Sequence, residues 1–446
     1  MTGLVTLQPL TFAPPPASPP KFHLLAGEPR LAFLVDGSRL FEIDPTFYGD
    51  LASGDPDAGR SLLEVAGIAP IPADPAERLS PPTSLSLNIA QACNLTCSYC
   101  YADEGRFGGR AELMSEEVAF AAVDRLLAGA RGKSVTVGFI GGEPLLNRPV
   151  LHATVAYACD RARERRQPVR FSITTNATLV NASDIELFRR HAFGISVSLD
   201  GSEAVNDANR RAHDGTSAWA AAVERLTPLL DDPGGVKLAA RSTVTHANLR
   251  ILERIDALSA VGFAEIGVAP VRTSPMPGLA LRENDWPRLL AEFVRAGDAE
   301  FGRVSQGLPL RFSNLATALK QIHHGSARRL PCGAGANYLS VSTSGEYFAC
   351  HRTIGDARFR MGASESDGAR ERFLSARDVD RQPLCSSCWA RYLCGGGCHA
   401  EVVASGRSGC DYIRGWLEYC LRFYDRLIRI HPDFFEHPAQ SMVATL

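Results

Sequence analysis

Short apolar runs alternate with helical patterns between residues 85 and 301, and this alternation restricts the fold more than any other feature of the chain. A strand followed by a helix and a further strand forms a βαβ unit, and successive units build a parallel sheet. We expect strands at 85–89, 134–140, 169–175, 194–199, 236–245 and 263–270. Helical patterns fall between them, at 116–128, 150–163, 183–190, 218–230 and 249–260. The sequence therefore predicts an α/β protein with a full or partial parallel β/α barrel.

The texture of the sequence divides the rest of the chain. A proline-rich run near the start excludes a helix there. After residue 331 the alternation stops, and a cysteine-rich, loop-rich region follows that ends in an apparent helix at 412–428. Before the barrel, three short apolar runs and a helix near 62–65 indicate a small α+β unit. We expect a linker at 1–20, the α+β unit at 21–83, the barrel at 84–310, the cysteine-rich domain at 325–425 and a tail at 426–446.

Charge and hydropathy exclude several classes of protein. The 446 residues include 47 basic and 49 acidic side chains, and a formal charge of −2 argues against binding to nucleic acid or to an anionic membrane. No apolar run is long enough for a transmembrane helix, and the first residues lack the pattern of a signal peptide. We therefore expect a cytoplasmic protein.

The twelve cysteines are bunched, and only Cys159 and Cys420 stand apart from the groups. In a reducing compartment, tight groups of thiols indicate metal binding rather than disulfides. The groups are Cys93, Cys97 and Cys100; Cys332 and Cys350; and Cys385, Cys388, Cys394, Cys398 and Cys410.

The first group has the spacing C-x₃-C-x₂-C and follows the first strand of the barrel, at the end where barrel folds place their chemistry. Three thiolates can hold three irons of a [4Fe–4S] cluster and leave the fourth iron open. S-adenosylmethionine (SAM) can bind there through its amino and carboxylate groups and accept an electron. The alternatives are a zinc site that lacks one ligand and a set of buried structural thiols.

The neighbouring motifs resemble those of the radical SAM superfamily. Gly141-Gly142-Glu143-Pro144 matches the glycine-rich motif of that superfamily, with Glu143 expected to accept a hydrogen bond from the methionyl ammonium and the glycine backbone expected close to the ligand. The resemblance implies that the carboxyl ends of the next strands line the SAM pocket. The implied pocket residues there are Asn176, Ser198 and Asp200, with Tyr99 near the adenine and Arg210 or Arg211 on the methionyl carboxylate. For Tyr99 the alternative is plain packing, and for each arginine it is a solvated surface position.

The cysteine-rich region resembles a SPASM domain, an extension that carries auxiliary iron–sulfur clusters. The resemblance implies one [4Fe–4S] cluster on Cys385, Cys388, Cys394 and Cys410, and another on Cys332, Cys350 and Cys398. With the SAM-binding cluster this makes three. The second auxiliary set lacks a fourth cysteine, so its open iron either binds a substrate thiolate or is completed by a different side chain. A zinc ribbon is the alternative to clusters.

Within the superfamily, anaerobic sulfatase maturases resemble this layout but carry a catalytic aspartate directly after the cysteine that corresponds to Cys350, where this chain has His351. The motifs look closer to thioether-forming maturases, such as those of six-cysteine peptides and of quinohemoprotein amine dehydrogenase. The resemblance implies hydrogen abstraction from a cysteine-containing ribosomal precursor peptide or small protein, followed by a Cys-to-carbon thioether, with a flavodoxin- or ferredoxin-type electron donor. Carbon–carbon cross-linking, side-chain oxidation and a non-catalytic iron–sulfur or zinc scaffold stay open.

The α+β unit has two interpretations. Related maturases often begin with a small domain whose exposed strand edge captures a leader segment by adding a strand to its sheet. Otherwise, the unit simply packs on the barrel.

Overall fold

The computed structural model describes residues 21–67, 80–276, 278–325, 327–362 and 368–436. The expected linker at 1–20, residues 68–79 of the expected α+β unit and the end of the expected tail lie outside the described residues. No helix in the described ranges is long and apolar enough to cross a membrane.

An eight-stranded sheet forms the centre of the protein, with the strand order β11-β10-β4-β5-β6-β7-β8-β9. Strands β4 to β9 follow one another in sequence and are all parallel to their neighbours, which confirms the expected parallel β/α barrel. They span β4 Ser84–Ala90, β5 Val135–Gly141, β6 Val169–Thr175, β7 Gly194–Ser198, β8 Lys237–Val244 and β9 Glu265–Pro270.

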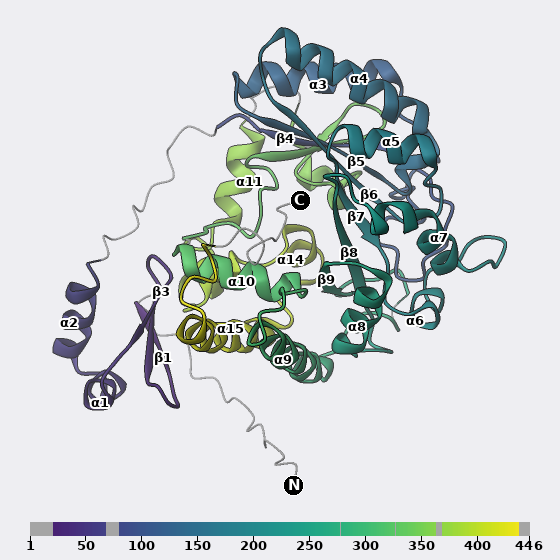
Figure 1. Cartoon of the computed structure of the whole chain (residues 1–446). Coiled ribbons are helices and arrows are strands. Elements are labelled where there is room, and N and C mark those ends of the chain that lie inside the picture. The colour runs from purple at the N-terminus through teal and green to yellow at the C-terminus, as the bar shows by residue number, and fades with distance from the viewer. Residues whose placement is uncertain (1–20, 68–79, 277, 326, 363–367, 437–446) are drawn as a thin grey trace.

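Helices pack along the outer face of this curved sheet, where Figure 1 shows α3, α4, α5 and α7 side by side. Phe193, just before β7, stacks on Phe171 of β6 with ring centroids 5.4 Å apart and meets Phe188 of α5 at 4.9 Å. The helices that connect the strands are α3 Glu116–Ala130, α4 Arg148–Glu164, α5 Ala182–Arg190, α6 Glu203–Asp207, α7 Ala218–Asp231 and α8 Ile251–Val261. This apolar outer layer leaves the carboxyl ends of the strands free to carry polar residues.

The cysteine-rich region extends the sheet, although the sequence suggested a loop-rich region without strands after residue 331. Strand β10 (Tyr338–Val341) lies parallel to β4, and β11 (Tyr347–Phe348) pairs antiparallel with β10. Ser86 of β4 donates a hydrogen bond to Ser340 of β10 at 2.8 Å. Strands of four and two residues are too short to show a period-two pattern, so the sequence did not reveal them.

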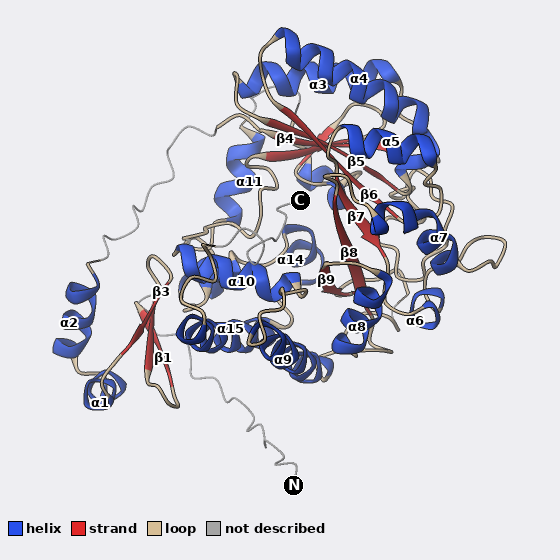
Figure 2. Cartoon of the chain, viewed as in Figure 1, coloured by secondary structure: helices blue, strands red, loops and turns tan. Residues whose placement is uncertain are grey.

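Further helices follow the barrel and close its open side (Figures 1 and 2). Two long ones, α9 and α10, were not among the expected elements, and the expected helix at 412–428 starts earlier, at Cys410. The helices are α9 Asp285–Val304, α10 Ser313–His324, α11 Ala369–Arg377, α12 Pro383–Ser386, α13 Arg391–Cys394, α14 His399–Ser405 and α15 Cys410–Ile430.

The small N-terminal unit has a three-stranded antiparallel sheet in the order β1-β2-β3, made of Phe22–Leu25, Leu31–Leu34 and Arg39–Glu42. Helices α1 (Pro45–Ser53) and α2 (Pro56–Ala66) follow, each beginning with proline after an aspartate cap. One face of the sheet packs on these helices, while Phe33 and its neighbours on the other face join the main core. The unit therefore packs on the rest of the protein, beside α10 and α15 (Figure 1).

Candidate active site

The loop after β4 carries Cys93, Cys97 and Cys100, which we call the SAM-loop triad. Burial, with smaller effects from the charges of Glu143, Cys97 and Cys100, raises the pKa of Cys93 to about 12, so these groups lie near its thiol. Cys93 Sγ also accepts long hydrogen bonds from the backbone N–H of Leu95 (3.5 Å) and from Asn176 Nδ2 (3.9 Å). The triad is thus a compact set of thiols at the carboxyl end of a barrel strand.

The glycine pair at the end of β5 holds this loop. The Gly142 N–H donates to Ala90 O, and the Glu143 N–H donates to Ala92 O, both at 2.8 Å. A Cβ on Gly141 would lie 2.3 Å from Ala90 O, and one on Gly142 would lie 2.2 Å from Ala92 O. Backbone cannot move aside as a side chain can, so glycine is required here by the cysteine loop itself. The sequence had suggested the approach of a ligand as the reason.

Glu143 is fully buried and ties three segments together. Its Oε1 accepts hydrogen bonds from the Leu145 N–H at 3.0 Å and from Thr175 Oγ1 at 2.8 Å, while Oε2 accepts from the Asn176 N–H at 2.8 Å. Burial raises the pKa of Glu143 to about 7, against these hydrogen bonds, which lower it. A carboxylate oxygen accepts two hydrogen bonds, so Oε2 keeps room for one further donor.

Tyr99, Asp200 and Arg210 form a buried network. Tyr99 donates to Asp200 Oδ2 at 2.6 Å and accepts from Arg210 Nη1 at 2.7 Å. Burial raises the pKa of Asp200, while the charge of Arg210 lowers it. Arg211, by contrast, is exposed and directs its Nε to the carbonyl of Asp207 at 3.3 Å. The structure thus places Arg210 beside the triad, where its charge also acts on Cys97, and Arg211 at the surface.

Two residues that the sequence analysis did not identify, Asn94 and Arg254, form hydrogen bonds to Asn176 and Asp200, two of the predicted pocket residues. Asn94, inside the cysteine motif, accepts from Asn176 Nδ2 at 2.9 Å, and its place between two cysteines was the available signal. Arg254, in α8, donates to the carbonyl of Asp200 at 2.5 Å, and nothing in a helical pattern marks such a residue. Ser198 is the last residue of β7, at the same edge of the sheet.

The other cysteines gather in two sets. Cys332, Cys350 and Cys398 form the auxiliary triad, and burial followed by the charges of Cys398 and Cys332 raises the pKa of Cys350 to about 11. The auxiliary tetrad contains Cys385, where burial and the charges of three partner thiols raise the pKa to about 11. The members of the auxiliary tetrad are Cys385, Cys388, Cys394 and Cys410. Cys159 lies in α4 near His191, and Cys420 is fully buried, so neither belongs to a set.

The surroundings of these thiols suit iron–sulfur clusters. Each thiolate of a [4Fe–4S] cluster binds its own iron, so the thiols of one set need to lie near one another but need not converge on one point. His399, next to Cys398, is 1% exposed and accepts from Arg377 Nε at its Nδ1 (3.0 Å). Arginine only donates, so the proton of the neutral imidazole is on Nε2, which has no acceptor in the described part of the chain. A sulfur atom of a cluster could accept this buried N–H.

One arginine connects the SAM-loop triad to the auxiliary triad. The guanidinium of Arg352 lies 5.0 Å from the ring of Tyr101, the residue after Cys100, and its Nη1 lies 3.7 Å from Cys398 Sγ. The same Nη1 pairs with Glu401 at 2.7 Å. Tyr101 is 42% exposed although it lies beside both regions.

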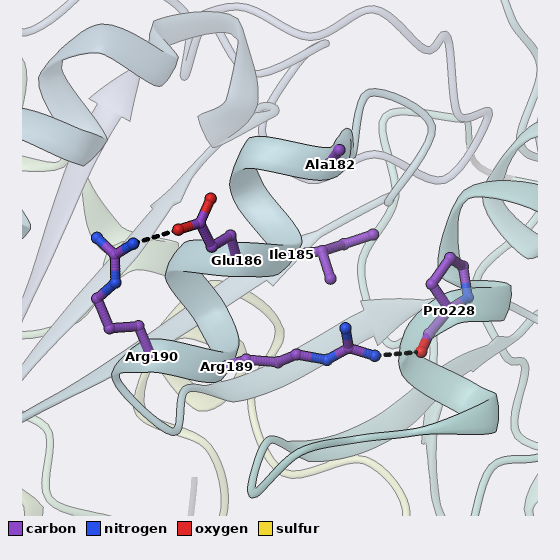
Figure 3. A pocket seen from close by; sticks show the side chains of 6 residues that line it. All are labelled: Ala182, Ile185, Glu186, Arg189, Arg190 and Pro228. Carbon is purple, nitrogen blue, oxygen red and sulfur yellow. Dashed lines mark hydrogen bonds and ion pairs between the residues drawn. The ribbon is translucent and has the colours of Figure 1, made fainter.

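A shallow groove of about 620 Å³ lies elsewhere, on the outer helices α5 and α7 (Figure 3). Its ends are marked by the ion pair of Arg190 with Glu186 and by the hydrogen bond from Arg189 to Pro228 O. None of the sequence-predicted site residues lines it.

Comparisons with curated proteins identify relatives over most of the chain. The serine-type anaerobic sulfatase-maturating enzyme of Klebsiella aerogenes is 27% identical over 350 residues, which cover 72% of this chain and 80% of that protein. The mycofactocin maturase MftC of Mycolicibacterium smegmatis is 26% identical over 347 residues, which cover 74% of this chain and 81% of that protein. The similarity to a sulfatase-maturating enzyme persists although the aspartate after Cys350 is absent.

Solved structures share the fold. Native anSMEcpe with bound AdoMet superposes with a TM-score of 0.65 at 19% identity, over 78% of this chain and 99% of that one. SuiB of Streptococcus suis bound to S-adenosylmethionine gives a TM-score of 0.51 at 16% identity, over 87% and 97% of the two chains. Residues 87–231, which hold the SAM-loop triad, the glycine motif and the Tyr99 network, match the family profile described as the Radical SAM superfamily. Over these residues the chain is therefore similar to the Radical SAM superfamily, and its fold is that of the two solved structures.

Proposed function

We propose that this radical SAM enzyme matures a cysteine-containing peptide by forming a Cys-to-carbon thioether. The observation that carries the proposal is the short connection through Arg352, which lies between Tyr101 beside the SAM-loop triad and Cys398 of the auxiliary triad. A carbon that loses hydrogen near the first site and a thiolate held at the second would then be neighbours. The product would lose two hydrogens per link: the SAM-derived radical would take one hydrogen atom, and the thiol proton would leave with one electron that the auxiliary clusters would accept.

The residues of the SAM-loop triad would hold a [4Fe–4S] cluster with SAM, which when bound supplies a carbon-centred radical that removes hydrogen from the substrate. The chain positions this chemistry. Gly142 fixes the cysteine loop, Glu143 Oε2 can accept from the ammonium of SAM, and the planar fork of Arg210 suits a carboxylate. Asn176, Ser198 and Asp200 would complete the pocket at the strand ends.

We assign the auxiliary triad and tetrad to two further clusters, for a total of three. The auxiliary triad has one ligand too few, which leaves a position for the substrate thiolate. His351 is the alternative fourth ligand, because its Nδ1 contacts Tyr338 Oη at 3.0 Å. The Ser86 hydroxyl donates to Ser340 and therefore accepts from Tyr338, so Tyr338 accepts from the Nδ1–H of His351. That tautomer leaves the Nε2 lone pair of His351 free for a ligand.

The precursor peptide would also need a docking place away from the chemistry. Within the described residues, β1 and β3 are the edge strands of the N-terminal sheet, and an extended leader segment could pair with either one. The electron donor would be a reduced flavodoxin- or ferredoxin-type protein.

The test is the intact mass of a small cysteine-containing protein encoded beside this chain, co-expressed with it. We expect loss of two hydrogens per link and a matching loss of thiols that can be alkylated. Cys398→Ser should abolish the link, whereas Cys159→Ser, outside all sets, should preserve it. Loss of hydrogens with every thiol still available for alkylation would instead establish carbon–carbon linkage or side-chain oxidation, the two other reactions that the sequence leaves open.

A further inference from the structure

Arg377, the last residue of α11, is a buried cation whose hydrogen-bond partners are all neutral. Arg377 is 7% exposed. Besides its bond to His399, Nη1 donates to Gln382 Oε1 at 3.0 Å, and Nη2 donates to the carbonyls of Gly396 (3.3 Å) and Gly397 (3.4 Å). No carboxylate in the described residues pairs with it, and a buried charge without a counter-charge is costly.

The partners of Arg377 lie on the loop that joins the two auxiliary sets. This loop runs from Cys394 of the auxiliary tetrad to Cys398 of the auxiliary triad. Its three glycines have φ values of 70°, 90° and 77°, which side chains rarely adopt, and a Cβ on Gly396 would lie 3.9 Å from Cys385 Sγ. The charge of Arg377 acts on Cys385 of the tetrad and on Cys332 and Cys398 of the triad. Arg377 therefore stands between the two sets.

Two further arginines near these thiols also have neutral partners. Arg407 donates to the Gly396 carbonyl at 2.7 Å and to Gln382, and its charge acts on Cys385 and Cys410 of the tetrad. Arg328 donates to the carbonyls of Pro331 and Leu393. The described part of the chain thus supplies cations here without the anions that would balance them. A cluster held by thiolates is an anion, and its reduction adds a negative charge.

We propose that Arg377 is a positioning residue that lies between the two auxiliary clusters and favours the reduced form of both. The planar fork of its guanidinium holds the glycine loop in place, while its charge stabilises the added electron on either side. The inference rests on the cluster sites assigned under the proposed function, and its test separates the two.

The test is a potentiometric titration of the auxiliary clusters, in which electron paramagnetic resonance measures the reduced form of each cluster. When alanine replaces the three cysteines of the SAM-loop triad, only the auxiliary clusters remain to give a signal, and about eight irons per chain are expected. In this background Arg377→Gln should shift the midpoint potentials of both clusters downward. Arg377→Lys, which keeps the charge, should retain the original potentials. Arg407→Gln should lower the potential of the tetrad cluster, because the charge of Arg407 acts on Cys385 and Cys410.

Arg381→Gln is the matched control, since Arg381 is an exposed arginine of the same segment whose hydrogen bond goes to Ser375, and it should shift neither potential. Loaded Arg377→Gln protein with both potentials unchanged, or with only one shifted, would overturn the inference. If the Arg377→Gln protein does not take up its auxiliary clusters, the midpoint potentials of Arg377→Lys are measured instead. Wild-type potentials in that variant uphold the role of the charge, and failure to load or lowered potentials reject it. Absence of iron from the background protein would reject the cluster assignment itself.

Discussion

At the scale of single residues, Glu143 shows how burial changes what a motif residue does. The sequence marked it as a partner for the ammonium of SAM, whereas the structure uses most of its hydrogen-bonding capacity to join the ends of β5 and β6. Its pKa of about 7 lies above the ordinary value for a glutamate because burial disfavours the charged form. Stability should therefore depend on pH through this one group.

The folded protein holds a proton on Glu143 up to a higher pH than the unfolded chain does, so this group's contribution to stability is lost as the pH rises through about 7. We expect the unfolding free energy of the SAM-free wild type, relative to Glu143→Gln, to fall by up to about 1.4 kcal/mol per pH unit between the unfolded and folded pKa values. Urea titrations of both proteins from about pH 5 to about pH 8 measure it. A constant difference across that range would contradict the raised pKa.

Residue positions differ in how well the sequence predicts them. Cys93, Cys97 and Cys100 could be grouped from spacing alone, because ligands that lie on one loop are close in sequence as well as in space. Spacing put Cys398 with Cys385, and only the resemblance to a SPASM domain set it with Cys350. The choice between Arg210 and Arg211 could not be made, since it depends on which side chain reaches Tyr99. Arg352 and Arg377 gave no signal at all, because their partners lie 46 residues away at Cys398 and 22 residues away at His399.

At the scale of elements, the turn after β5 and the cysteine loop after β4 form one unit. The carbonyls of Ala90 and Ala92 accept from the backbone of Gly142 and Glu143, and the glycine pair leaves no space between the two segments. The position of the SAM-loop triad is therefore set by the neighbouring strand as much as by its own.

Gly142→Ala should displace the cysteine loop, because its Cβ would meet the backbone of Ala92 and Gly105 at 2.2–2.9 Å. We expect loss of the iron bound by the SAM-loop triad, about four atoms per chain, with the auxiliary iron retained. Iron analysis together with circular dichroism measures this and checks that the fold persists. Gly302→Ala is the control, since a Cβ at Gly302 of α9 meets nothing within 4 Å, and it should load fully. Full iron content in Gly142→Ala would show that the loop can shift without losing its ligands.

Strands and helices with strong patterns were predicted well, and β6 was placed at its observed bounds. Helices α1 and α2 show where the prediction was incomplete. Each starts at a proline that follows an aspartate, which is a helix-start signal, but the prediction took no account of it and placed one short helix at 62–65. Strand β10 could not be predicted, because its place beside β4 depends on a partner about 250 residues away in the sequence.

At the scale of the whole molecule, the N-terminal unit is joined to the cysteine-rich region by an aromatic stack. The ring of His23 in β1 lies parallel to that of Trp389, with centroids 4.0 Å apart, and Phe33 meets Trp389 edge-on at 5.9 Å. Trp389 directly follows Cys388 of the auxiliary tetrad. Arg391, which is buried, adds a contact to Asp36 at 3.3 Å.

Trp389→Ala should loosen the N-terminal unit, because it removes the ring that covers His23 and Phe33. We expect faster amide hydrogen exchange in residues 22–42, by about tenfold or more for a loss of roughly 1.5 kcal/mol or more of local stability, with β4 to β9 unchanged. Trp389→Phe retains a stacking ring and should stay near the wild type. Iron content measured in parallel separates loosening of the unit from loss of the tetrad. Unaltered exchange in residues 22–42 would mean that other contacts hold the unit.

The pairing of β10 with β4 restricts how the sequence of such an enzyme can evolve. Four registered residue pairs join the strand that precedes the SAM-loop triad to the strand that lies between Cys332 and Cys350. The separation of these two cysteine sites is therefore fixed by rungs of a hydrogen-bonded ladder and not by the length of the chain that connects them. Insertions between β9 and β10 could enlarge or reshape the space for a substrate while the span from one reactive centre to the next stays constant.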